Sequence, residues 1–138
     1  MEAAQTTYDI VFSGFGASSC ILIHELHKKN ELQNKRILII DPSEKKTNEK
    51  TFCFWAKPSD DIIEDYKEIV THSWSKVMID QKQKREINPL KYHHISCEGL
   101  YNKTREILKQ YDVTMSREEV TQIEEENQVL ITALNRTY

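Results

Sequence analysis

The segment from Tyr8 to Asp41 constrains the fold of this chain more than any other part of its sequence. It contains two short apolar runs, residues 8–13 and 36–40, and neither alternates regularly between apolar and polar side chains. Such runs are typical of strands that are buried on both faces of a parallel sheet. Residues 17–29 lie between them and have helical periodicity. The segment therefore predicts a β-strand, an α-helix and a second, parallel β-strand joined by a right-handed crossover.

The predicted helix has one apolar stripe and a basic C-terminal turn. Lys28 and Lys29 fall in the last turn, where positive charge complements the helix dipole. The stripe consists of Cys20, Ile21, Ile23, His24 and Leu26.

The turn before this helix reads Gly14-Phe-Gly16-Ala-Ser-Ser19, a G-x-G-x-x-S form of the dinucleotide-binding fingerprint. Gly14 permits the tight turn, and Gly16 lets the backbone approach a pyrophosphate, which the helix N-terminus attracts. Ser19 stands where a third glycine is usual. The candidate cofactor contacts in this turn are Gly14, Phe15, Gly16, Ala17, Ser18 and Ser19.

Asp41 ends the second predicted strand, 22 positions after Ser19. An acid at this place accepts hydrogen bonds from a ribose diol, and its charge disfavours the 2′-phosphate of NADP. An ordinary small-residue turn between a strand and a helix is the alternative interpretation. Asp41 and the predicted β-α-β frame together favour a nucleotide site.

The remainder of the sequence predicts further helices and strands after a polar loop. Ser59 is the expected N-cap of a short helix, and Ser96 is the expected N-cap of a longer helix that reaches about Gln110. The helices are expected over residues 60–70 and 97–110, and the strands over 74–79, 84–87, 92–95, 113–115, 120–124 and 129–133.

Residues 8–16 and the stretch Asn48-Glu-Lys-Thr-Phe-Cys-Phe-Trp55 resemble the N-terminal part of lycopene β-cyclases of the bacterial flavoprotein type. That family carries a similar Asn-Asp-x-Thr-Trp-Cys-Phe-Trp stretch. In this chain Glu49 stands in place of the family's Asp and Phe52 in place of its first Trp, and both replacements are conservative. His72-Ser-Trp74, which is followed by a predicted strand, also follows the family's order. The same holds for Tyr92-His-His-Ile95, which leads into the predicted helix with Leu100-Tyr101. The resemblance therefore covers nearly the whole chain.

The resemblance implies an enzyme that uses reduced FAD to close the ends of lycopene, or of a related linear carotenoid, into β-rings without net redox change. NAD(P)H is a possible reductant. The family's acidic motif and its C-terminal Gly-Asp segment are expected beyond Tyr138, so the chain is expected to be an N-terminal fragment, neither stable alone nor catalytic. Val120 is expected to receive the adenine edge on backbone groups. The alternative is an FAD- or NAD-linked oxidoreductase or monooxygenase with the same N-terminal frame.

The expected fold class is α/β, with a Rossmann-like FAD/NAD(P)-binding β-α-β start, an added β-rich segment and an incomplete domain. Residues 1–47 form the expected dinucleotide unit, residues 48–95 begin a substrate-side segment, and residues 96–138 return to the nucleotide-binding region.

The charge and the cysteine content of the chain limit which binding partners and which cellular compartment are expected. The net charge is −3, and lysines and arginines are scattered among acids, so nucleic acid is not expected as a partner. The three cysteines are widely spaced, which favours free thiols in the cytoplasm. No membrane-spanning segment is expected. Contact with the periphery of the inner membrane is plausible because lycopene dissolves only in lipid.

Three other groups of residues have a functional and a structural interpretation. Phe52, Phe54, Trp55 and Trp74 either line a channel for a polyene or pack in a core, and core packing is favoured. A zinc site at His93, His94 and Cys97 is disfavoured because adjacent strand residues point to opposite faces. The acids Asp60, Asp61 and Glu124–Glu126 are interpreted as solvated.

Overall fold

The computed structural model describes residues 6–45, 50–134 and 136–138. The chain divides into two compact units, which we call unit 1 (Met1–Lys45 and Lys103–Tyr138) and unit 2 (Lys46–Asn102). Among the described residues, no helix is long and apolar enough to cross a bilayer.

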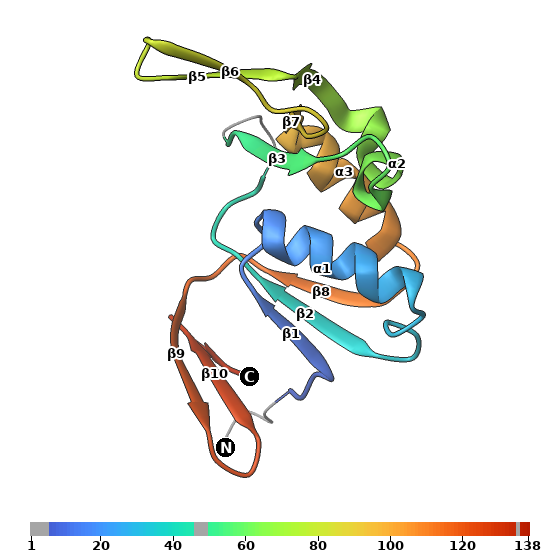
Figure 1. Cartoon of the computed structure of the whole chain (residues 1–138). Helices are drawn as coiled ribbons and strands as arrows, with labels where there is room; N and C mark the ends of the chain where they lie inside the picture. Colours follow the sequence, from blue (N-terminus) through green and yellow to red (C-terminus); the bar gives the residue numbers. More distant parts are fainter. Residues whose placement is uncertain (1–5, 46–49, 135) are drawn as a thin grey trace. The chain divides into compact units, whose positions relative to one another are not determined.

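Unit 1 contains a parallel sheet in the order β1-β2-β8 (Figure 1). Strand β1 (Ile10–Ser13) leads into helix α1 (Ala17–Lys28), and β2 (Arg36–Ile40) follows. Strand β2 pairs in parallel with β1 on one side and with β8 (Asp112–Ser116) on the other. The predicted strands and helix are thus present, and their order places the carboxyl ends of β1 and β2 side by side.

The central strand β2 is buried on both of its faces, as its unbroken apolar run predicts. Leu38 and Ile40 form a cluster with Ile131 of a second sheet, while Ile37 and Ile39 are equally buried on the opposite face. That second sheet is antiparallel, in the order β11-β10-β9. Its strands are β9 (Val120–Glu125), β10 (Val129–Ala133) and β11 (Arg136–Thr137).

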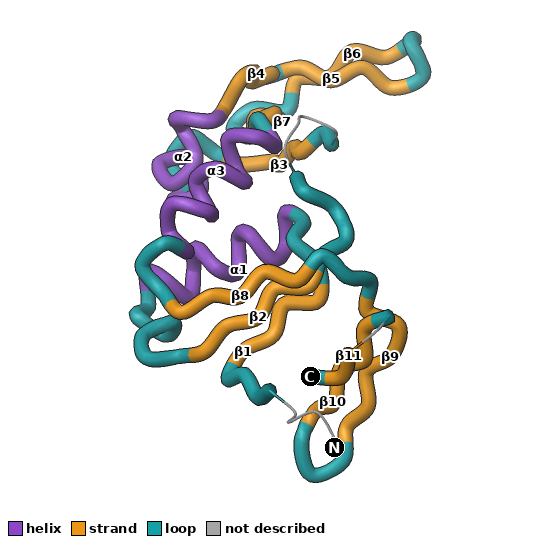
Figure 2. Tube along the Cα trace, turned by 180° about the vertical axis from the view of Figure 1, so that it is seen from behind, coloured by secondary structure: helices purple, strands orange, loops and turns teal. Residues whose placement is uncertain are grey.

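Unit 2 contains an antiparallel sheet in the order β3-β7-β4 and a separate hairpin, β5-β6, which Figure 2 shows from behind. The helix α3 (Cys97–Leu108) starts in unit 2 and continues into unit 1. Its predicted N-cap is confirmed, because the Ser96 hydroxyl accepts a hydrogen bond from the Gly99 N–H at 3.0 Å. The other elements are β3 (Phe52–Ala56), α2 (Asp61–Tyr66), a 3-10 turn (Lys67–Ile69), β4 (Val70–Trp74), β5 (Lys76–Ile79), β6 (Gln83–Glu86) and β7 (Lys91–Ile95).

The helix predicted over residues 60–70 is shorter in the structure. It ends as an α-helix at Tyr66, and Val70 already belongs to β4, where it pairs with Ile95. Pairing with a distant strand therefore overrides the local helical periodicity. The N-cap is Asp60 and not the predicted Ser59.

The predicted apolar stripe of α1 is wrong at Ile21. This side chain is 38% exposed, whereas Cys20, Ile23 and His24 are buried. His24 is buried because its Nε2 lies 2.8 Å from the Thr104 hydroxyl, a contact between two helices that local sequence does not reveal.

Candidate functional site

The glycine turn between β1 and α1 has the geometry that its sequence predicts. Gly14 has a φ of 104°, a region that favours glycine, and its N–H donates to the carbonyl of Ile40 at 2.7 Å. Gly16 is the N-cap of α1, and a Cβ built there would meet no heavy atom of the described residues within 4 Å. The first turn of α1, which the structure describes in full, contains no acidic residue. The helix itself thus supplies no negative charge at its N-terminus, where the backbone N–H groups of its first turn attract anions.

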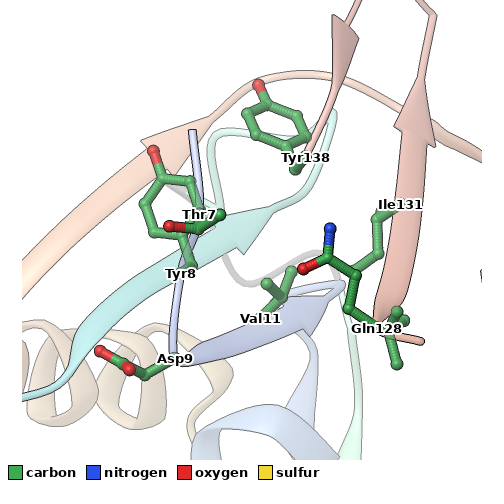
Figure 3. A pocket seen from close by; sticks show the side chains of 8 residues that line it. Thr7, Tyr8, Asp9, Val11, Gln128, Ile131 and Tyr138 are labelled. Atoms are coloured by element: carbon green, nitrogen blue, oxygen red, sulfur yellow. The ribbon is translucent and has the colours of Figure 1, made fainter. Parts of the chain in front are cut away.

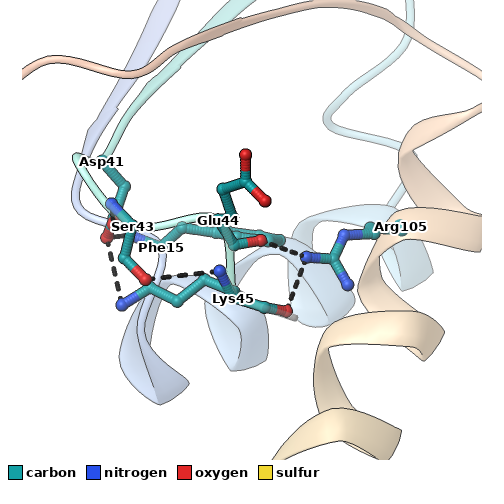
Figure 4. A network of polar contacts seen from close by, with 6 residues as sticks. All are labelled: Phe15, Asp41, Ser43, Glu44, Lys45 and Arg105. Carbon is teal, nitrogen blue, oxygen red and sulfur yellow. Dashed lines mark hydrogen bonds and ion pairs between the residues drawn. The ribbon is translucent and has the colours of Figure 1, made fainter. Parts of the chain in front are cut away.

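Asp41 closes this turn from the end of β2. Its Oδ2 accepts a hydrogen bond from the backbone N–H of Phe15 at 2.7 Å, and its Oδ1 accepts one from Ser43 at 2.8 Å (Figure 4). The Asp41 backbone N–H donates to the carbonyl of Ser116 at 3.0 Å, which links β2 to the end of β8. The structure therefore brings together the two parts of the predicted nucleotide site, the turn and the acid.

Arg105 of α3 organises the loop that follows Asp41, and the sequence analysis missed it. Its Nη2 donates to the backbone carbonyls of Glu44 at 2.9 Å and Lys45 at 2.8 Å. Its guanidinium also lies 5.9 Å from the centroid of the Phe15 ring (Figure 4). The Lys45 ammonium in turn lies 3.5 Å from the Asp41 carboxylate. No local motif marks Arg105, because its partners are 60 positions away.

A cavity of about 330 Å³ lies beside this network, at the ends of β2 and β8. Its wall combines acids, cations and apolar side chains. The residues that define it include Asp41, Ser43, Arg105, Val113, Met115 and Arg117.

The other predicted contacts take different positions. Ala17, Ser18 and Ser19 form the first turn of α1. The Phe15 side chain is buried, and its backbone N–H donates to Asp41. Val120 is half-buried at the start of β9 and packs against the cluster around Ile131. Asn48 and Glu49 of the aromatic motif lie outside the described residues.

A second cavity of unit 1, of about 380 Å³, lies between the start of β1 and strand β10 (Figure 3). Tyr8 and Tyr138 meet edge to face there, with ring centroids 6.1 Å apart. Its lining residues are Thr7, Tyr8, Asp9, Val11, Gln128, Val129, Ile131 and Tyr138, so it lies apart from the glycine turn and Asp41.

The two histidines of β7 lie on opposite faces of the strand. His93 is buried, with its Nδ1 2.7 Å from the Ser73 hydroxyl, whereas His94 interacts with Thr71 on the opposite face. In the part of the chain that the structure describes, no group of three metal-binding side chains comes together.

Residues 9–136 match the sequence model of the family described as lycopene cyclase protein. The chain belongs to the lycopene cyclase family. This confirms the resemblance inferred from the glycine turn and the aromatic motif. No curated protein matches the chain significantly.

Solved structures with similar folds include FAD-dependent monooxygenases and halogenases. PqsL from Pseudomonas aeruginosa, a probable FAD-dependent monooxygenase, is 12% identical, with a TM-score of 0.57 over 94% of this chain and 39% of its own. FqzB is 12% identical, with a TM-score of 0.58 over 99% of this chain and 35% of its own. The halogenase PltM is 11% identical, with a TM-score of 0.57 over 95% of this chain and 32% of its own. The chain thus shares the fold of about a third of these proteins.

Proposed function

We propose that this chain supplies the FAD-binding part of a lycopene cyclase, which closes the linear ends of lycopene or a related carotenoid into β-rings. The observation that carries the proposal is the family match over residues 9–136. The contact between Asp41 and the glycine turn supports it, because it joins the residues that a dinucleotide needs.

The residues present fit the ADP half of FAD in a Rossmann-like site. The space above Gly16 would admit a pyrophosphate against the first turn of α1. Asp41 would accept hydrogen bonds from the ribose, and the cavity beside it would take the adenine. Val120, which packs against the cluster around Ile131 and does not line this cavity, is proposed only as a backbone contact to the adenine edge. Ala17, Ser18 and Ser19 would supply N–H groups, while Gly14 and Phe15 shape the turn.

When bound in its reduced form, FAD would support ring closure without net redox change, with NAD(P)H as the proposed reductant. The residues of this chain bind and orient the cofactor's nucleotide end. We assign no proton donor to the described residues. We further propose that residues 48–95 contribute to the substrate side, and that the protein works in the cytoplasm with peripheral contact to the inner membrane, where a lipid-soluble substrate is found.

A FAD-linked monooxygenase is the second candidate, because solved structures of similar fold include PqsL, which is described as a probable FAD-dependent monooxygenase. The aromatic stretch from Thr51 to Trp55, which resembles the cyclase motif, favours the first candidate. The products distinguish the two functions: a cyclase yields a β-ring isomer of lycopene, and a monooxygenase yields an oxygenated product.

The test has two parts: to titrate the chain with FAD and compete with ADP, and to incubate a full-length family protein that contains this chain with reduced FAD and lycopene in detergent. Saturable binding that ADP displaces is expected, and Gly16→Val should abolish it. Failure of both FAD and ADP to bind would overturn the nucleotide site. An oxygenated product would favour the monooxygenase over the cyclase.

A further inference from the structure

The sheet β3-β7-β4 of unit 2 carries three aromatic side chains in one line, one from each strand. The register pairs Trp55 with Tyr92, and Tyr92 with Trp74. Directly paired residues lie on the same face of a sheet, so the rings form a row across the strands, which we call the aromatic row. Ring centroids are 4.5 Å apart for Trp55 and Tyr92, and 6.1 Å apart for Tyr92 and Trp74.

The aromatic row is exposed although its members are large. Trp55 is 52% exposed and Trp74 is 43% exposed. His72 extends the surface, because its ring stacks on Trp74 with an interplanar angle of 8° and a centroid distance of 5.5 Å. An exposed cluster of this kind in a folded unit marks a binding surface more often than a packing requirement.

The opposite face of the same sheet supplies the core of unit 2. Phe52 meets Tyr101 of α3 edge to face, Phe54 stacks on His93, and Ile95 is buried. The four aromatic residues that the sequence groups together are therefore split between two faces. Core packing accounts for Phe52 and Phe54, but it does not account for Trp55 and Trp74.

The strand residues on the face that carries the aromatic row include no lysine, arginine or carboxylate, and their ionisable nitrogen groups are the imidazoles of His72 and His94. In strands 52–56, 70–74 and 91–95, which the structure describes in full, the only lysine, arginine or carboxylate is Lys91. Lys91 pairs with Ala56, so it lies on the face opposite the aromatic row. A platform for nucleic acid would combine its rings with cations, and a charged ligand would lose its hydration here without compensation.

We infer that the aromatic row binds an extended, uncharged, apolar chain of the conjugated isoprenoid type. A line of rings across strands about 4.8 Å apart offers an elongated, flat and apolar surface. A conjugated chain matches this surface in shape and in charge. The inference deepens the proposed function and rests on it, because the proposed substrate, a linear carotenoid, has this chemistry.

Tryptophan fluorescence provides a direct readout, since both tryptophans of the chain lie in the aromatic row. The probe is retinyl acetate, an uncharged conjugated isoprenoid ester whose absorption overlaps tryptophan emission. We expect saturable quenching in the full chain. Tyr92→Ser and Trp55→Ser should each weaken binding by about tenfold or more, because each removes one ring from the contact.

Ile79→Ser is the matched control, since Ile79 is also about half exposed, at 53%, but lies in the separate hairpin β5-β6. It should leave the affinity unchanged, and circular dichroism should show that all variants are folded. Quenching that does not saturate, or equal losses in Ile79→Ser and Trp55→Ser, would overturn the site.

Sedimentation and FAD titration separate the remaining outcomes. Self-association that Trp55→Ser abolishes, without retinyl acetate binding, would assign the aromatic row to a second copy of the chain and overturn the inference. If the chain binds FAD but not retinyl acetate, the inference about the aromatic row would be overturned and the proposed function would stand. Failure to bind FAD would count against the proposed function itself, while saturable quenching sensitive to Tyr92→Ser would still support the site.

Discussion

The Asp41 carboxylate accepts a hydrogen bond from the backbone N–H of Phe15 at 2.7 Å, across 26 positions of sequence. The bond joins the end of β2 to the glycine turn, so one side chain both fixes the turn and offers its remaining acceptor capacity to a ligand. Changes at Asp41 should therefore affect folding and nucleotide binding together.

Asp41→Asn should weaken FAD binding by about 1.5–3 kcal/mol, the usual range for a hydrogen bond to a charged group, and should also lower the free energy of unfolding. FAD titration and urea denaturation measure the two effects. The matched control is Asp9→Asn, because the Asp9 carboxylate accepts the Arg36 N–H at 2.7 Å at the other end of β1 and β2. This control should lose stability and keep its FAD affinity. An unchanged FAD dissociation constant in Asp41→Asn would place the ribose elsewhere.

The two glycines of the turn should respond differently to alanine. Gly14→Ala should lower the free energy of unfolding by about 1–2 kcal/mol, because its φ of 104° strains any residue with a Cβ. Gly16→Ala should change stability by no more than about 1 kcal/mol, since its φ of −91° is permitted and its Cβ would meet open space. It should nevertheless weaken FAD binding at least about tenfold, through a clash with the pyrophosphate. Wild-type FAD affinity in Gly16→Ala would contradict the site.

Arg105→Met should loosen the loop after Asp41, because it removes the donors to the Glu44 and Lys45 carbonyls. Faster amide hydrogen exchange at Ser43 and Lys45 is expected, with FAD affinity lower by about 1–2 kcal/mol. Lys109→Met is the control for charge, since Lys109 lines the same cavity and pairs with Glu106. Equal losses of FAD affinity in the two variants would indicate a general electrostatic effect and not the loss of the Arg105 hydrogen bonds to the loop.

Burial raises the pKa of the Cys20 thiol from 9.0 to about 11, although a hydrogen bond with Thr104 opposes the shift. The folded chain therefore holds this proton more tightly than the unfolded chain does. The resulting stability is fully present below pH 9 and is lost as the pH rises toward 11, by about 2–3 kcal/mol. Urea denaturation between pH 8 and 11 should show that the free energy of unfolding falls less steeply with pH for Cys20→Ala than for the wild type. Parallel curves would contradict the shift.

Gly99 should be intolerant of alanine although it lies in a helix, where alanine usually stabilises by up to about 1 kcal/mol. A Cβ at Gly99 would lie 2.8 Å from Cγ2 of Ile69, so α3 would have to move away from the turn before β4. We expect Gly99→Ala to lower the free energy of unfolding by about 1–2 kcal/mol. In an Ile69→Ala background, Gly99→Ala should lower the free energy of unfolding by less than it does in the wild type. An equal loss in both backgrounds would show that contact with Ile69 is not the cause.

The sequence predicts the tight turn at Gly14 and its position between a strand and a helix. Gly14 and Asp41 are recognised because strand, turn and helix follow one another within a short segment, where periodicity and turn chemistry are decisive. The role of Arg105 could not be predicted, since it depends on where α3 meets the loop at Glu44. Val70 falls at the end of a predicted helix but lies in a strand for a similar reason, because its pairing with Ile95 is a long-range contact that overrides local preference.

The open surroundings of Gly16 also bear on how this position can change over evolutionary time. Folding tolerates a Cβ there, because a Cβ at Gly16 would meet no heavy atom of the described residues within 4 Å. In a related chain that no longer needs a nucleotide, Gly16 should therefore be among the first positions of the turn to drift, whereas Gly14 should persist for conformational reasons. The residue found at this one position in a relative thus becomes a marker of retained cofactor binding that is independent of overall sequence identity.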